Sequence, residues 1–154
     1  MASQRVSGSV IIDAPAATVF AIVADPHQHS RIDGSGSVRG IVDGPRRLTR
    51  GATFAMRMRL FGLPYRITNR VVEYERDRLI AWRHFGAHRW RYELEALSSG
   101  GTRVTETFDY SRYRGWVHVL RLLRFPERNR RGIERTLPRL KAAAEADART
   151  LGNR

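Results

Sequence analysis

Apolar and polar residues alternate along most of the chain between residues 54 and 110. One parity carries aromatic and long aliphatic side chains, such as Phe54, Met56 and Met58, while arginines such as Arg57 and Arg59 occupy the other. Because successive side chains of a strand point to opposite faces, the alternation predicts antiparallel strands with one concealed face and one wet, basic face. We expect these strands at residues 53–61, 65–75, 78–85, 89–98 and 102–111.

Short turn signals such as Gly62-Leu63-Pro64 separate these segments. Connections this short force neighbouring strands to pair antiparallel. Within the segment 65–75, Val72 and Tyr74 fall on the solvent parity, which predicts a bulge that reverses the two faces near the end of that strand.

Other patterns flank this ladder of strands. A first strand is expected at residues 6–13, followed by a helix that begins at Pro15, where the missing amide proton is harmless, and that ends before Pro26. A second short helix at 26–32 and a strand at 37–42 lead into the ladder. From Pro126 a long helix carries an apolar stripe with spacings of four, three and four residues, formed by Ile133, Leu137, Leu140 and Ala144.

The segment 116–125 is very apolar and has two interpretations. It is either a lid at the mouth of a cavity, able to open for a ligand or to touch a membrane surface, or a simple cap on the core. We favour the lid, because Gly115 and Pro126 provide hinge points on either side.

Composition predicts one ordinary folded domain over residues 1–154, since 42% of the residues are hydrophobic and no tract is of low complexity. No apolar run approaches the roughly 20 residues that a membrane span needs, and the N-terminus lacks a signal-peptide block, so we expect a cytoplasmic protein. The absence of cysteine excludes disulfides and thiolate chemistry. The oligomeric state is not indicated.

The formal net charge of +13 raises the question of a nucleic-acid partner. All but one of the 28 basic residues are arginine, and Lys141 is the exception. The arginines fall on the solvent parity of several different strands rather than in one block, which is an ordinary way to keep a sheet wet and its edges protected. The pattern therefore favours a solvated basic surface over nucleic-acid binding.

The concealed face mixes bulky side chains with polar ones, a composition better suited to lining a ligand cavity than to filling a dry core. Plain core packing is the alternative for each aromatic residue. The candidate ligand-binding residues are Met56, Met58, Asn69, Trp82, His84, Trp90, Tyr92, Glu106, Phe108 and Tyr110.

Glu106 is the most informative of these residues, because Val104 and Phe108 two positions away on either side place it on the apolar face. A buried carboxylate must be paired or protonated. His84 and Asn69 are candidate partners, and a hydrogen-bonded pair of Glu106 and His84 could move a proton. The alternative is that Glu106 lies near the strand end and bonds to an arginine or water.

No cofactor or metal site is expected. His27 and His29 are two residues apart and point in different directions, without an acidic cluster beside them. No nucleophile motif is present, and Gly34-Ser35-Gly36 precedes a strand rather than the helix that a phosphate-binding loop requires.

The order of strand, two short helices, antiparallel strands and long C-terminal helix resembles the helix-grip fold of the START-like or SRPBCC superfamily, in its polyketide cyclase/dehydrase and lipid-transport branch. The resemblance covers nearly the whole chain, and the following segments carry it: Val10 to Pro15, Val19-Phe20, Val23 to Pro26, Gly101 to Thr105 and Leu137 to Leu140. It implies an α+β fold in which a curved, seven-stranded antiparallel sheet grips the long helix around a cavity for a hydrophobic or aromatic molecule. The superfamily has no universal catalytic motif to transfer.

Three functions remain open. The first is binding of a lipid or polyketide-like molecule in the cavity, with Asn69, His84 and Glu106 orienting it. The second is an aromatase/cyclase-type reaction with Glu106 or His84 as general acid or base. The third is a basic surface module that binds RNA or anionic lipid.

Overall fold

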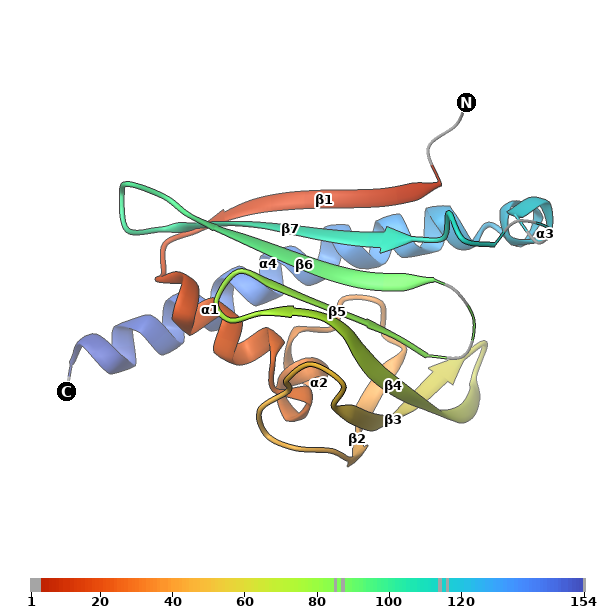
Figure 1. Ribbon diagram of the computed structural model, residues 1–154, viewed down its shortest axis with the longest axis horizontal. Helices are drawn as coiled ribbons and strands as arrows, with labels where there is room; N and C mark the ends of the chain where they lie inside the picture. The colour runs from red at the N-terminus through yellow and green to blue at the C-terminus, as the bar shows by residue number, and fades with distance from the viewer. Residues whose placement is uncertain (1–3, 85, 87, 114, 116, 154) are drawn as a thin grey trace.

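A computed structural model describes residues 4–153 except 85, 87, 114 and 116. The described strands form one seven-stranded antiparallel sheet in the order β1-β7-β6-β5-β4-β3-β2 (Figure 1). They are β1 (Arg5–Ile12), β2 (Val38–Asp43), β3 (Thr53–Leu60), β4 (Leu63–Glu75), β5 (Leu79–Arg83), β6 (Arg89–Ala96) and β7 (Thr102–Asp109). The helices are α1 (Ala16–Val23), the 3-10 turn η1 (Pro26–Gln28), α2 (His29–Ile32), α3 (Val117–Leu122) and α4 (Phe125–Gly152). The predicted order of elements is confirmed.

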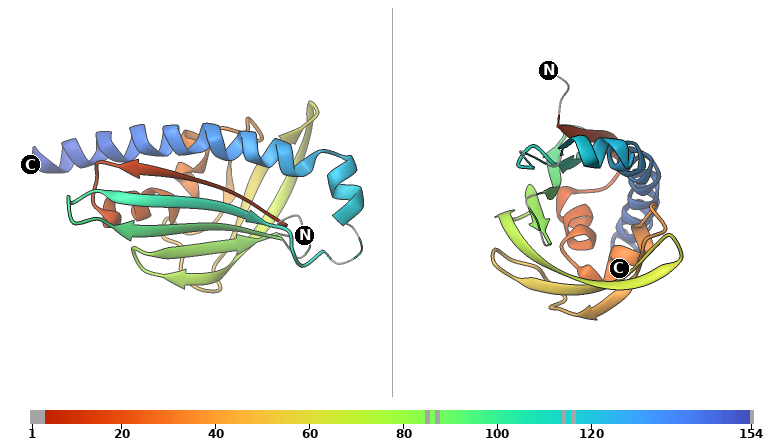
Figure 2. Two further views of the ribbon diagram at one scale, coloured as in Figure 1. Left: turned by 90° about the horizontal axis from the view of Figure 1, so that it is seen from above. Right: turned by 90° about the vertical axis from the view of Figure 1, so that its right-hand side faces the viewer.

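The sheet is a curved wall, and α4 runs along its open side (Figure 2, right). The short helices α1 and α2 lie inside the curve (Figure 2, right). The chain therefore has the predicted helix-grip architecture, with seven antiparallel strands around a long C-terminal helix.

The predicted bulge near the end of β4 is confirmed. The pairing of β4 with β5 shifts register between Val71 and Glu73. Beyond the shift, the ring of Tyr74 packs edge-on against that of Phe20, with the centroids 5.7 Å apart. The bulge thus turns Tyr74 toward the core, against the simple alternation of the strand.

One face of the middle of α4 packs solidly on β1, where Ile133, Leu137 and Leu140 are buried. A Cβ added at Gly8 would lie 2.9 Å from Ile133 Cγ2 and 3.2 Å from Leu137 Cδ1. Glycine at position 8 therefore allows the helix to approach the strand closely. We call this region the packed end.

The loop after α2 crosses α4 at Gly34. A Cβ at Gly34 would collide with main-chain atoms of Arg135 and Thr136, and the Gly34 amide donates a hydrogen bond of 2.9 Å to Thr136 Oγ1. This crossing lies at the level of the packed residues Ile133 and Leu137. Toward the N-terminus of α4 the space under the helix is hollow.

The segment 116–125 forms α3 and the start of α4, with Trp116 outside the described residues. Arg124 separates the two helices in a left-handed conformation, at φ 57°. Leu122 is 83% exposed and Leu123 is also exposed, so these two side chains do not cap the core. In the described part of the chain, no helix is long and apolar enough to cross a membrane.

Candidate functional site

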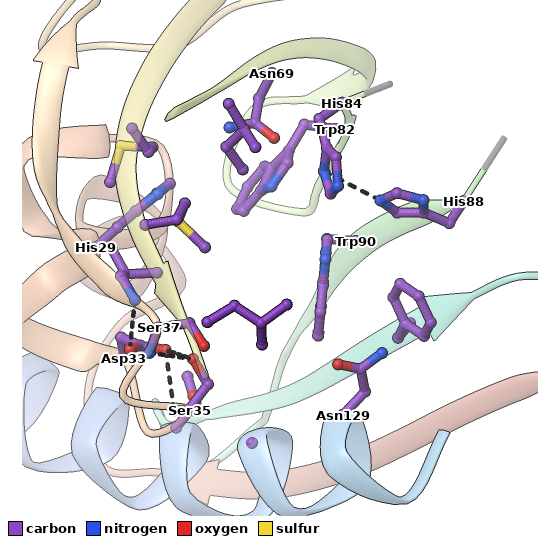
Figure 3. A pocket seen from close by; sticks show the side chains of 18 of the residues that line it. His29, Asp33, Ser35, Ser37, Asn69, Trp82, His84, His88, Trp90 and Asn129 are labelled. Atoms are coloured by element: carbon purple, nitrogen blue, oxygen red, sulfur yellow. Dashed lines mark hydrogen bonds between the residues drawn. The ribbon is translucent and has the colours of Figure 1, made fainter. Parts of the chain in front are cut away.

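A cavity of about 570 Å³ lies between the concave face of the sheet and the N-terminal half of α4 (Figure 3). Side chains of β3 to β7 form its wall, the segment from α2 to β2 closes one side, and α4 forms the roof. We call this region the hollow end. Its volume falls within the range typical of small-molecule sites.

Nine of the ten candidate residues line this cavity. They are Met56, Met58, Asn69, Trp82, His84, Trp90, Tyr92, Glu106 and Phe108. Tyr110 differs from the prediction, because it is buried outside the lining with its ring stacked on that of Phe108 at 5.8 Å. Alternation along the strands therefore identified most of the wall.

Glu106 is paired with Tyr92, the residue directly opposite it in the β6–β7 register. The Tyr92 hydroxyl donates a hydrogen bond of 2.8 Å to Glu106 Oε1, and Glu106 is only 3% exposed. Its Oε2 has no hydrogen-bond partner among the described residues. The side chain that pairs with Glu106 is therefore a tyrosine and not the arginine considered from the sequence.

Burial raises the pKa of Glu106 to about 8, and the negative charge of Asp33 adds to the shift, although the Tyr92 hydrogen bond opposes it. The pKa of Tyr92 is also raised, because its hydroxyl is buried beside the Glu106 carboxyl. At neutral pH, Glu106 is therefore a neutral carboxylic acid that retains its proton inside the cavity.

His84 belongs to a different cluster, so the suggested Glu106–His84 pair is wrong. His84 Nδ1 is 3.1 Å from His88 Nε2, and His88 Nδ1 is 2.7 Å from the Tyr113 hydroxyl. Glu106 lies opposite Tyr92, which pairs with Ile80, four residues before His84. At about 3.3 Å per residue, His84 is too far along the sheet to reach it.

Burial lowers the pKa of both histidines, to about 4 for His84 and to about 3 for His88, where the His84 ring contributes as well. Both imidazoles are neutral at pH 7. Each keeps one protonated nitrogen and one acceptor nitrogen, so the chain from His84 to Tyr113 is a polar but uncharged edge of the cavity.

Sequence reasoning missed the contribution of His29. This residue is buried, its Nε2 lies 2.9 Å from the Val23 carbonyl oxygen, and its ring stacks on Trp82 with centroids 5.0 Å apart. Burial lowers the pKa of His29. Its position in a four-residue helix gave no periodic signal that could show which way the ring points.

The roof residues from α4 were also missed. They form a row on α4 beside the apolar stripe, made of Phe125, Arg128, Asn129, Gly132 and Thr136. Asn129 points from α4 into the cavity (Figure 3). The spacing of three and four residues was present in the sequence, but polar and small side chains on it resemble a solvated face.

The described residues contain no group of three or more histidines, aspartates or glutamates placed to hold a metal ion. Aromatic rings instead dominate the cavity wall. The ring centroids of Phe54 and Tyr92 lie 5.6 and 5.7 Å from that of Trp82, and those of Trp90 and Phe108 are 4.8 Å apart. A curved sheet that grips a helix over an aromatic hollow defines a small-molecule-binding class of fold.

The chain belongs to the family described as polyketide cyclase / dehydrase and lipid transport, whose family model matches residues 3–145. Uncharacterized protein Rv0088 of Mycobacterium tuberculosis is 49% identical over 139 residues, which cover 88% of this chain and 62% of that protein. The chain thus spans about 62% of the length of the curated relatives that it matches.

Solved structures show the same fold at low identity. Protein Ms6760 from Mycobacterium smegmatis has a TM-score of 0.65 at 19% identity, with 91% of this chain and 92% of that chain covered. TTHA0849 from Thermus thermophilus has a TM-score of 0.69 at 16% identity, with 94% and 99% covered. At such identities the likeness concerns the fold alone.

Proposed function

We propose that the chain binds one hydrophobic or aromatic small molecule, of lipid or polyketide-like chemistry, in the cavity under α4. The observation that carries the proposal is a hollow of about 570 Å³ whose wall is mainly aromatic and aliphatic. Release of water from the apolar surfaces of ligand and wall would drive binding.

A few polar groups would fix the orientation of the ligand. The protonated Glu106 has an oxygen without a partner among the described residues, and it lies beside Tyr92 and on the same wall as Asn69. A buried acid in this state donates a hydrogen bond to a carbonyl or hydroxyl oxygen. His84 offers a second polar contact farther along the sheet.

The test uses the neutral fluorescent probe 1-N-phenylnaphthylamine, excited above the tryptophan absorption band, together with native mass spectrometry for a co-purified apolar molecule. Asn129→Trp fills the cavity from its roof, and Arg131→Trp adds the same ring on the exposed face of α4. We expect at least a tenfold loss of probe affinity in the first variant and parent-like binding in the second.

Equal probe affinity in both tryptophan variants would contradict binding inside the cavity. Absence of probe binding to the parent chain, together with absence of a co-purified molecule, would contradict the proposal as a whole.

A second candidate is acid catalysis of cyclisation or dehydration on a polyketide-like chain, favoured by one observation. Glu106 has a pKa of about 8, so it holds at pH 7 the proton that a general acid must deliver. Glu106→Gln removes this proton but keeps the shape of the side chain. Turnover of a linear poly-β-ketone should be lost while probe binding remains, and equal turnover in parent and variant would remove this candidate.

A further inference from the structure

Four arginines gather on the outer face of the sheet. Arg39 on β2, Arg57 and Arg59 on β3 and Arg66 on β4 line one surface groove. Arg57 and Arg66 lie directly opposite each other in the strand register. Like charges in that position destabilise a sheet, so the cluster opposes folding unless an anion compensates it.

No acidic side chain supplies that compensation within the described part of the chain, where none of the ion pairs includes any of these four arginines. The other half of the outer face is different. There Glu73 pairs with Arg89 at 3.2 Å, and Glu95 pairs with Arg103 at 3.0 Å. The unneutralised charge is therefore concentrated on the β2–β3–β4 side, and the directly opposed Arg70 and Arg83 extend it to the start of the β4–β5 pair.

The groove adjoins an exposed apolar tip. Phe61, in the turn between β3 and β4, is 79% exposed and Leu63 is 70% exposed. Arg59 Nε donates a hydrogen bond of 3.2 Å to the Gly62 carbonyl, which joins the arginine cluster to this turn. Large apolar side chains in water beside basic residues are typical of a surface that enters a lipid headgroup layer.

A second apolar element lies at the same end of the molecule. Figure 2 (left) shows the β3–β4 turn, α3 and the N-terminus of α4 together at this end, where Leu122 and Leu123 are exposed. Arg128 of α4 places its guanidinium 4.4 Å from the centre of the Phe61 ring. Exposed apolar side chains of two separate segments thus lie at the same end of the molecule as the arginine groove.

We propose that this end of the molecule docks on membranes that contain anionic lipids. Phe61 and Leu63 enter the headgroup layer, and Arg39, Arg57, Arg59 and Arg66 bind lipid phosphates. A nucleic acid would also satisfy the arginines, but it offers no apolar layer for Leu63 and Leu122. The charge complementarity and the aliphatic tips together therefore select a lipid surface.

The position of the surface has a consequence that rests on the proposed function. Tyr65 and Met58 border both the arginine groove and the cavity, and Leu60 and Phe125 line the cavity close to the apolar tips. Docking would thus bring the cavity next to the bilayer, from which an apolar ligand can enter without crossing water.

The test is co-sedimentation with vesicles of phosphatidylcholine alone and of phosphatidylcholine with 30 mol% phosphatidylglycerol, at low and high salt. We expect the parent chain to bind the anionic vesicles only, and less at high salt. Each arginine near such a surface contributes about fivefold in affinity, so Arg57→Gln with Arg66→Gln should weaken binding about 25-fold.

Two matched controls separate this site from general charge and general hydrophobicity. Arg78→Gln with Arg103→Gln removes the same charge from arginines that are paired with Glu75 and Glu95. This double variant should lose far less affinity for the anionic vesicles. Phe61→Ser with Leu63→Ser should weaken vesicle binding more than tenfold. Ile11→Ser with Leu151→Ser, at two exposed positions elsewhere, should leave vesicle binding unchanged.

Several outcomes would overturn the proposal. These are no binding to anionic vesicles, equal binding to neutral ones, equal losses in groove and control variants, or tighter binding of an RNA oligonucleotide that survives Phe61→Ser with Leu63→Ser. Probe binding in solution reports on the cavity separately. If vesicles fail to bind while 1-N-phenylnaphthylamine still binds, only this inference falls, and the reverse result removes only the proposed function.

Discussion

Two faces of α4 rest on very different surroundings. At the packed end Leu140 is completely buried, and Ile133 and Leu137 lie within contact distance of β1. At the hollow end Asn129 and Gly132 face a cavity of about 570 Å³. One helix therefore packs into the core with one face and forms the roof of the cavity with another.

This difference shows how the chain separates stability from binding. Close packing at one end stabilises the sheet and helix against each other, because each buried methylene contributes through transfer from water and through contacts. The other end leaves contacts unmade and keeps ionisable groups away from water. The free energy of unfolding should therefore depend on side-chain truncation at the packed end and on pH through the ionisable groups at the hollow end.

The largest expected effect comes from Leu140→Ala at the packed end. Removing a fully buried leucine leaves a cavity, so the free energy of unfolding should fall by about 2–5 kcal/mol. Asn129→Ala at the hollow end removes no tightly packed group and should change it by less than about 0.5 kcal/mol. Urea denaturation measures both, and similar losses would contradict the contrast between the two ends.

The next effect is a pH dependence that belongs to the hollow end. The folded pKa of Glu106, about 8, lies above its unfolded value, so the folded state holds the extra proton and stability falls as pH rises toward 8. Between pH 6.5 and 8 the fall should be about 2 kcal/mol. His84 and His88, with lowered pKa values, destabilise the fold only below pH 6.5.

Glu106→Gln should flatten this slope above pH 6.5, and the slope rather than the offset is diagnostic, because the glutamine amide changes the hydrogen bonding. Glu134→Gln, at an exposed position of α4, is the matched control and should keep the slope. An unchanged slope in Glu106→Gln would show that another group titrates.

Tyr92→Phe should have a smaller effect. It removes the hydroxyl that donates to Glu106 Oε1, at a cost of about 1 kcal/mol near pH 6. Since this hydrogen bond lowers the pKa of Glu106, its loss should move the carboxyl pKa further up. Infrared detection of the protonated carboxyl group over a pH series measures the shift, and a downward movement would contradict the assigned pairing.

Gly132→Ala should have the smallest of the four expected effects. Alanine is favoured over glycine inside a helix by about 1 kcal/mol, and the new Cβ would lie 3.4 Å from Ser35 Cβ, close to ordinary contact. A gain in the free energy of unfolding of up to about 1 kcal/mol is expected. A loss in thermal or urea denaturation would show that the roof is already tightly packed there.

The sequence predicted the packed end better than the hollow end. Apolar residues spaced by three and four gave the helix face, and strand alternation placed Asn69 and Glu106 inward, because both signals depend only on local periodicity. The partner of Glu106 could not follow from periodicity. It depends on the β6–β7 register, which sets Tyr92 rather than His84 opposite the carboxyl.

His88 and Tyr113 show the remaining difficulty. Both lie outside regular strands, and their hydrogen bond brings together segments 25 residues apart. Neither residue belongs to a periodic sequence pattern that would predict which way its side chain points, so only the folded structure reveals them as cavity residues. The prediction that residues 116–125 act as a lid remains a prediction.

The crossing at Gly34 influences how this chain can diversify. The loop meets α4 through main-chain atoms at residues 135 and 136 and through the Thr136 hydroxyl, so substitution of cavity residues other than Thr136 leaves these contacts in place. Other residues on the roof and walls can therefore be exchanged, which changes the shape of the cavity, while the packing of α4 on β1 is kept.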